Sequence, residues 1–117
     1  MAGFTTAFSR TTLNAAIENG DKIQWSTDGT NETAHVDATT ITTWKAASDA
    51  DPAVRDNDGA YLSAACADDA VEVTHFRVVD SAETTIKTDW TALSSSRTLD
   101  TGDKLSIADG EINVTLT

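Results

Sequence analysis

The chain has 117 residues and a formal net charge of −11, from 19 acidic and 8 basic side chains. This length fits one domain with a hydrophobic core of its own, and the acidic balance excludes nucleic-acid binding and adhesion to anionic membranes, which both need clustered Lys and Arg. The single cysteine, Cys66, excludes an intramolecular disulfide, and the sequence predicts neither a secretion signal nor a membrane span.

The first segment with helical periodicity is residues 4–18. Large apolar side chains recur there at helical spacing: Phe4, Phe8, Leu13 and Ile17. Asn19-Gly20 supplies a stop signal, because glycine suits the left-handed conformation that follows a helix. We therefore assign residues 1–20 to an N-terminal helix or an extended arm, with Phe4 and Phe8 as candidate interface residues.

From Lys22 onwards the sequence is a series of short β-type segments separated by turn residues. The predicted strands are 22–27, 33–36, 39–44, 61–66, 71–80, 85–87, 90–93, 97–99, 104–107 and 112–116. Asp28-Gly29 and Asp109-Gly110 predict hairpin turns. Short strands at spacings of about 8–12 residues are typical of a β-sandwich or barrel. We expect a mainly β protein with one short N-terminal helix, in which residues 21–117 form an antiparallel β-sandwich or jelly-roll-like barrel.

Residues 71–80 form the longest β-type run of the sequence. Its alternating positions place apolar residues on both faces, with Val71, Val73 and Val79 on one face. Phe76 and Val78 are on the other. A strand of this kind is expected at the centre of a sheet, covered on both sides.

The longest polar segment, residues 46–59, holds the best candidates for a metal site. Asp49, Asp51, Asp56 and Asp58 offer the hard oxygen ligands that calcium prefers. The segment lacks the ligand order and central glycine of an EF-hand loop. We therefore expect a solvated loop, or one ordered by a neighbouring subunit, and no bound cofactor.

The sequence carries no catalytic signature. His75 has no Gly-x-Ser-x-Gly elbow to accompany it, so we interpret it as a structural or surface histidine. Cys66 is followed by Asp68 and Asp69, whereas a reactive thiol needs positive charge nearby. Neither residue predicts an enzyme.

Three tryptophans leave two alternatives open. Trp25 alternates with Ile23, which favours the core, whereas Trp44 and Trp90 are candidate interface residues. Exposed tryptophans also serve as sugar-stacking platforms, so a carbohydrate-binding module that uses Trp90 or Trp44 is the alternative.

The C-terminal part of the chain resembles a family of small virion proteins of tailed bacteriophages. The resemblance rests on segments that occur in the same order and at similar spacing: residues 44–48, 73–76, 78–82, 90–93, 101–105 and 108–116. Arg77 stands where that family usually has glycine. The resemblance covers roughly residues 40–117, and the N-terminal helix occupies a comparable place.

This resemblance implies a non-enzymatic component of the virion, made in the cytoplasm of a bacterial host. Two placements are open: a capsid decoration (cement) protein that binds the major capsid protein on the outside of the mature head, and a tail or tail-fibre component. We favour the first, because the chain has no heptads or repeats of the kind many fibres need. A closed homo-oligomer, with a trimer favoured, also fits, because symmetry repeats one modest interface.

Overall fold

The structure is a computed structural model that describes residues 6–48 and 53–115. In this part of the chain one helix precedes eight strands: α1 (Thr6–Ala16), β1 (Lys22–Ser26), β2 (Thr39–Thr40), β3 (Val54–Asp56), β4 (Tyr61–Leu62), β5 (Val71–Val79), β6 (Thr91–Leu99), β7 (Ser106–Ile107) and β8 (Asn113–Thr115). The predicted class, mainly β with one short helix, is confirmed.

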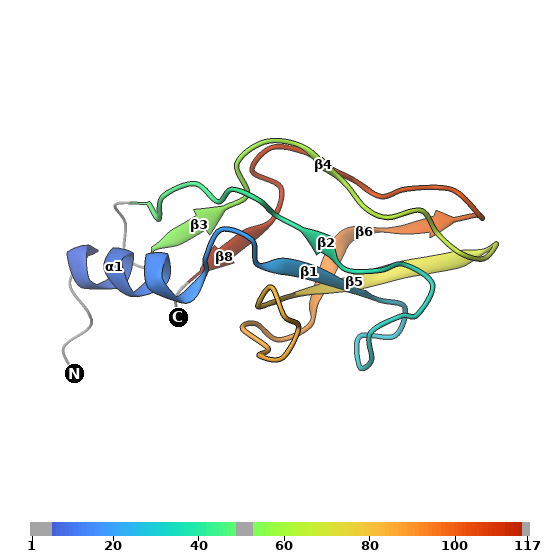
Figure 1. Cartoon of the computed structure of the whole chain (residues 1–117), viewed down its shortest axis with the longest axis horizontal. Helices are drawn as coiled ribbons and strands as arrows, with labels where there is room; N and C mark the ends of the chain where they lie inside the picture. The colour runs from blue at the N-terminus through green and yellow to red at the C-terminus, as the bar shows by residue number, and fades with distance from the viewer. Residues whose placement is uncertain (1–5, 49–52, 116–117) are drawn as a thin grey trace.

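Four of the strands form one antiparallel sheet in the order β2-β1-β5-β6 (Figure 1). β5 lies inside this sheet between β1 and β6, so the central position predicted for residues 71–80 is confirmed. β6 and the two-residue strand β2 are the edges.

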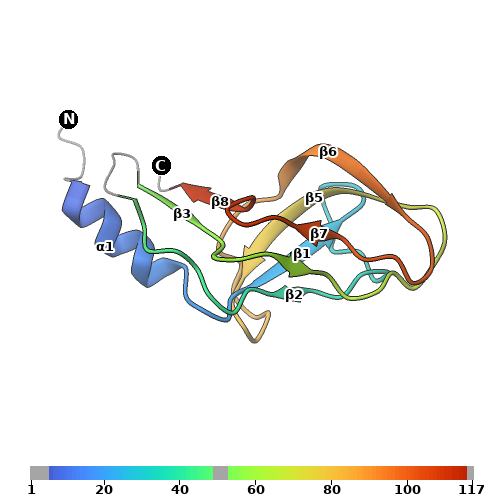
Figure 2. The same ribbon diagram turned by 90° about the horizontal axis from the view of Figure 1, so that it is seen from above.

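The other four strands join into one long ribbon. β3 pairs with β8 and β4 pairs with β7, both antiparallel, and backbone hydrogen bonds from Ser63 to Leu105 and from Cys66 to Asp103 extend the pairing. Residues 54–66 and 102–115 therefore run side by side, and we call this pair of segments the ribbon. Its β4–β7 part lies over one face of the sheet, and its β3–β8 part extends beyond the sheet beside α1 (Figures 1 and 2). The described part of the second layer is thus a two-segment ribbon and not a full sheet.

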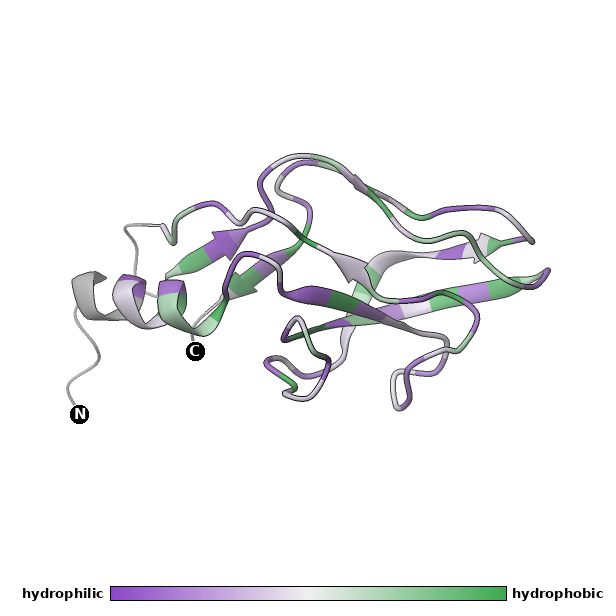
Figure 3. Cartoon of the chain, in the orientation of Figure 1, coloured by the Kyte–Doolittle hydropathy of each residue, from purple (hydrophilic) through white to green (hydrophobic). Residues whose placement is uncertain are grey.

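The hydrophobic core lies between the sheet, the ribbon and α1. The sheet contributes Ile23 and Trp25, and the ribbon contributes Ile107 and Ile112. α1 packs against β3 and adds Leu13 and Ile17, each only 2% exposed. Apolar and polar residues alternate along β5, as the hydropathy colouring shows (Figure 3). The helix is therefore part of the same core as the strands.

The pairing of β5 with β6 contains a register shift, and its extra residues lie in β6. Val73 pairs with Arg97 but His75 pairs with Ala92, so two steps along β5 correspond to five along β6. One core includes side chains from both predicted faces: Val71, Val73, Phe76 and Val78. The predicted division of these residues between two separate faces is therefore wrong: Val71, Val73 and Val78 belong to one core, and Phe76 packs against it.

The hairpin predicted at Asp28-Gly29 does not form, and residues 33–36 are not a strand. The side chains of Ser26 and Asp28 accept hydrogen bonds from the backbone N–H groups of residues 28–31. These local bonds compete with strand pairing. β1 therefore pairs with β2 and β5 instead.

Two further predictions of strand arrangement are wrong. Residues 91–93 and 97–99, predicted as parts of two separate strands, belong to the single bulged strand β6. β7 and β8 flank Asp109-Gly110 but pair with β4 and β3 and not with each other. The buried side chain of Asn57 holds this arrangement, because it donates to Ala108 O and accepts from Ile112 N.

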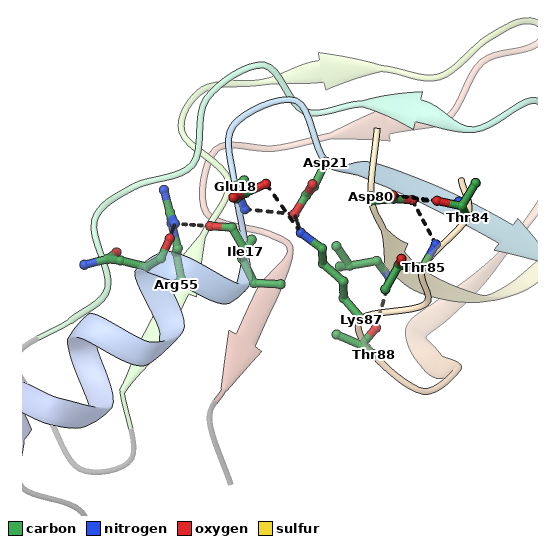
Figure 4. Close-up of polar contacts among 11 residues, drawn as sticks. Ile17, Glu18, Asp21, Arg55, Asp80, Thr84, Thr85, Lys87 and Thr88 are labelled. Atoms are coloured by element: carbon green, nitrogen blue, oxygen red, sulfur yellow. Dashed lines mark hydrogen bonds and ion pairs between the residues drawn. The ribbon is translucent and has the colours of Figure 1, made fainter. Parts of the chain in front are cut away.

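Arg55 of β3 anchors the C-terminal end of α1 (Figure 4). Its guanidinium donates to the backbone carbonyls of Asn14, Ile17 and Lys45, and the residue is 8% exposed. Burial lowers the pKa of this guanidinium. The last carbonyls of a helix have no partner within the helix, so a buried arginine satisfies groups that would otherwise be orphaned.

Candidate protein-binding groove

A groove with a volume of about 290 Å³ lies between β6 and the ribbon, and we call it the seam groove. Its floor is apolar: Trp25, Phe76, Leu105, Ile107 and Ile112. Apart from half-buried Phe76, these side chains are at most 5% exposed, so the floor is continuous with the core. Pockets for whole small molecules have volumes of roughly 300–1,000 Å³. The volume of the seam groove is at the lower end of this range.

The wall formed by β6 is an exposed strand edge. Eight of its nine residues, Thr91 to Thr98, are exposed or half-buried, and Leu99 is buried. One side of β6 pairs with β5, and the other side pairs with no strand in the described part of the chain. Unpaired backbone groups on a long edge are a template for strand addition. β6 also lacks the Lys and Pro residues that proteins use to block such an edge.

The seam groove is close to electrically neutral in a strongly acidic protein. Its only charged lining residues are Arg97 on β6 and Glu111 on the ribbon. Arg97 donates to Ser95 O over 3.1 Å, which places the guanidinium along the β6 edge. A segment that enters the groove therefore meets an apolar floor with one charge of each sign on the walls.

The opposite face of the sheet is covered by polar contacts. The guanidinium of Arg77 lies 4.2 Å from the ring centre of Trp90, a cation–π contact, and donates to Gln24 Oε1 over 2.7 Å. The indole N–H of Trp90 donates to Thr30 O. Burial, followed by the nearby Glu83 carboxylate, raises the pKa of Glu32 at this face.

The three tryptophans do not form a shared exposed platform. Trp25 and Trp44 are 2% and 3% exposed and belong to the core. The indole nitrogen of Trp44 is a buried polar atom without a hydrogen-bond partner. Trp90 is half-buried, and Arg77 covers one face of its ring. Of the predicted interface tryptophans, Trp90 alone retains appreciable surface.

The remaining predicted interface residues are at the N-terminus. Phe4 lies outside the described residues. Phe8 belongs to α1, but its side chain lies outside the described part of the structure.

The predicted calcium ligands are not brought together by the described residues. Asp56 lies in β3, where its backbone carbonyl accepts the N–H of Lys45, and Asp58 is exposed. Asp49 and Asp51 lie outside the described residues. Among those that the structure describes, no group of three or more His, Cys, Asp or Glu side chains is placed to hold a metal ion.

The seam groove was missed by the sequence analysis, although several of its residues were assigned to strands. Its walls come from residues 91–97 and 105–113, which are brought together only by the packing of the ribbon on the sheet. The one usable signal was the polar run Ser94-Ser95-Ser96 between the predicted strands 90–93 and 97–99. Such a run marks a strand that is exposed.

Comparison with known proteins identified no relative of this chain. No protein-family model matches the chain, and no similar curated protein or solved structure was found. In the described residues, no helix has the length and apolarity needed to cross a membrane.

Proposed function

We propose that this chain is a non-enzymatic structural protein of a tailed-phage virion, a decoration protein that binds the outer surface of the mature head and stabilises it. The seam groove carries this proposal. It combines an unpaired strand edge with an apolar floor, which is the arrangement by which proteins bind extended polypeptide. A groove of this kind, suited to an extended polypeptide, supports a role in assembly.

The segments that resemble the phage virion family support the same reading. Residues 73–76, 90–93, 101–105 and 108–116 all contribute to the walls or floor of the seam groove. These segments are distant in sequence and meet around one surface. The resemblance and the groove therefore concern the same part of the molecule.

This mechanism stabilises the shell by binding alone and requires no covalent or catalytic step. A protein that binds the assembled shell and not its disrupted states lowers the free energy of the shell by mass action. Many copies on one shell, or a closed oligomer that contacts several capsid subunits at once, gain further from avidity. The net charge of −11 keeps the unbound protein soluble.

The test is quantitative mass spectrometry on separated heads and tails of the parent virion, with the copy number taken relative to the major capsid protein. We expect near-stoichiometric copies on heads, and heads stripped of the protein should disrupt at lower temperature until the purified protein is added back. A few copies on tails would move the protein to the adsorption apparatus. Absence from both fractions would contradict any role in the virion.

A further inference from the structure

We propose that the seam groove is a contact between two copies of this chain, in which Leu62 of each copy packs into the seam groove of the other. This contact deepens the proposed function, on which it rests, because it names the occupant of the same groove. It applies equally to a protein on heads or on tails.

Leu62 is a large apolar side chain that the fold leaves in solvent, with 64% of its surface exposed. It lies on β4 directly opposite Ser106 of β7, and Ser106 lines the seam groove. Ile107, the next residue of β7, is buried in the core, so alternation places Ser106 and Leu62 on the outer side of the ribbon. Side chains directly opposite each other on neighbouring strands have Cβ atoms about 5 Å apart. An exposed apolar side chain and an apolar groove are therefore neighbours on one surface.

Charge favours a second copy as the occupant. The strands that form this surface belong to segments without a charged side chain: residues 60–67, 91–96 and 105–108. The two charged residues that line the groove, Arg97 and Glu111, have opposite signs. Two molecules with a net charge of −11 repel each other, and the repulsion is smallest where the facing surfaces carry no net charge. A basic partner would instead be attracted to the acidic surfaces of this protein.

The position of Leu62 beside the groove indicates a twofold contact. Each copy carries both halves of the contact, an apolar side chain without cover and an apolar floor that can cover it. In a twofold contact the same surface is used on both copies, so each half meets the other reciprocally. Because the two halves lie side by side on one surface, a single twofold axis between them forms both contacts at once.

A head-to-tail contact is the alternative, and it closes into rings or continues into open chains. Such a contact uses two different surfaces of each copy, whereas Leu62 and the groove share one surface. The contact through Leu62 therefore predicts a dimer in place of the trimer favoured from sequence, and the number of copies is a result that the experiment measures.

The first experiment measures the mass of the full-length chain by sedimentation velocity over a range of concentrations. We expect a monomer–dimer equilibrium that Leu62→Glu weakens by at least about tenfold, because a carboxylate would enter an apolar groove. Ile86→Glu is the matched control: Ile86 is 59% exposed and does not line the groove, so dimerisation should be unchanged. In the groove, Ala92→Glu should weaken dimerisation, whereas Thr40→Glu, on the exposed opposite edge of the sheet, should not. Circular dichroism checks that each variant is folded.

The second experiment measures proximity and does not depend on a loss of binding. Full-length chains with Leu62→Cys and Ala92→Cys are mixed and treated with a short bis-maleimide, and we expect cross-linked pairs that contain one chain of each variant. A mixture of Leu62→Cys with Thr40→Cys should give no such pairs above background. Cys66 is only 2% exposed, and the wild-type chain measures its contribution to the background.

Salt distinguishes an apolar contact from one held by ion pairs. Raising the ionic strength from about 0.01 M to about 0.15 M shortens the Debye length from about 30 Å to about 8 Å, which screens the repulsion between two acidic molecules. We therefore expect salt to strengthen dimerisation. Dimerisation that salt weakens would mean that opposite charges hold the copies together, which contradicts this contact.

The proposal is overturned if the wild-type chain is monomeric at every concentration, or if Leu62→Glu associates as well as Ile86→Glu. An associated species of three copies would contradict the twofold contact, and cross-linking of Leu62→Cys to Thr40→Cys but not to Ala92→Cys would place Leu62 on another surface. None of these measurements involves shells, so their failure leaves the decoration role to its own test. A dimer that is absent from the virion would overturn the decoration role alone.

Discussion

The ammonium group of Lys87 lies 2.7 Å from the carboxylate of Asp21, whose side chain is 3% exposed (Figure 4). This ion pair ties the turn after α1 to the loop that follows β5. Asp21 also accepts the backbone N–H of Glu18, so one buried carboxylate both closes the turn after α1 and joins it to the loop of Lys87.

Removal of the Lys87 ammonium group should lower the stability of the fold. We expect Lys87→Met to lower the free energy of unfolding by about 2–3 kcal/mol, because the buried Asp21 carboxylate would lose its ion-pair partner. Lys45→Met is the matched control. Its pair with Asp109 spans 3.2 Å between side chains that are 42% and 57% exposed, so its loss should cost less than about 1 kcal/mol. Urea unfolding measures both, and equal effects would contradict the prediction.

Arg55 should determine whether α1 stays docked. Arg55→Met leaves the carbonyls of Asn14 and Ile17 without their donor, and we expect a loss of about 2–4 kcal/mol in unfolding free energy. Arg55→Lys should restore only part of it, since an ammonium lacks the planar fork of a guanidinium. In Arg55→Met, the rate of amide hydrogen exchange should increase more in α1 than in β5, relative to the wild type. Equal acceleration in both elements would indicate that the helix is not selectively released.

Gly29 and His75 should be energetically coupled. Gly29 has a φ of +75°, and a Cβ at this position would lie 2.9 Å from the imidazole ring of His75. Gly29→Ala should therefore destabilise the protein by about 1–3 kcal/mol through backbone strain and the clash. His75→Ala should remove the clash and leave only the strain. A double-mutant cycle by urea unfolding measures the coupling, and strictly additive effects would contradict it.

Asp28 should titrate at unusually low pH. Hydrogen bonds from the backbone N–H groups of Asn31 and Thr30, and from the hydroxyl of Ser26, lower the pKa of this carboxyl from 3.8 to about 2. A depressed pKa in the folded state stabilises the fold above the unfolded value, and that stability is lost as the pH falls from about 4 through about 2. In Asp28→Asn this part of the acid dependence should disappear. NMR titration of the Asp28 carboxyl carbon checks the value, and a midpoint near 3.8 would contradict it.

The pattern of apolar and polar residues in the sequence was sufficient to predict the fold class and several of the helices and strands. Ile23 and Trp25 alternate along β1 and are buried, as predicted. Leu13 and Ile17 mark the core-facing side of α1. These patterns are local, because a side chain four positions along a helix or two along a strand faces the same way whatever its partner is.

The candidate site was not predictable in the same way. The seam groove depends on Ala92 of β6 and Ile107 of the ribbon lining the same groove, and neither residue has an unusual sequence environment. Trp44 illustrates the reverse error: it was a candidate for an interface, but it lies in the core beside β3. Hydrophobicity marks a residue for burial without indicating whether its own chain or a partner will bury it.

The sequence by itself determined an acidic chain, mainly β, with an N-terminal helix and a long central strand, because composition and periodicity express local backbone preference. Only the tertiary structure decided how the strands pair: that β7 and β8 run along β4 and β3, that β6 is one bulged edge strand, and that an apolar groove opens beside it. Strand pairing brings together residues such as Tyr61 and Ile107, whose contact depends on the whole chain's packing and not on their neighbours in sequence.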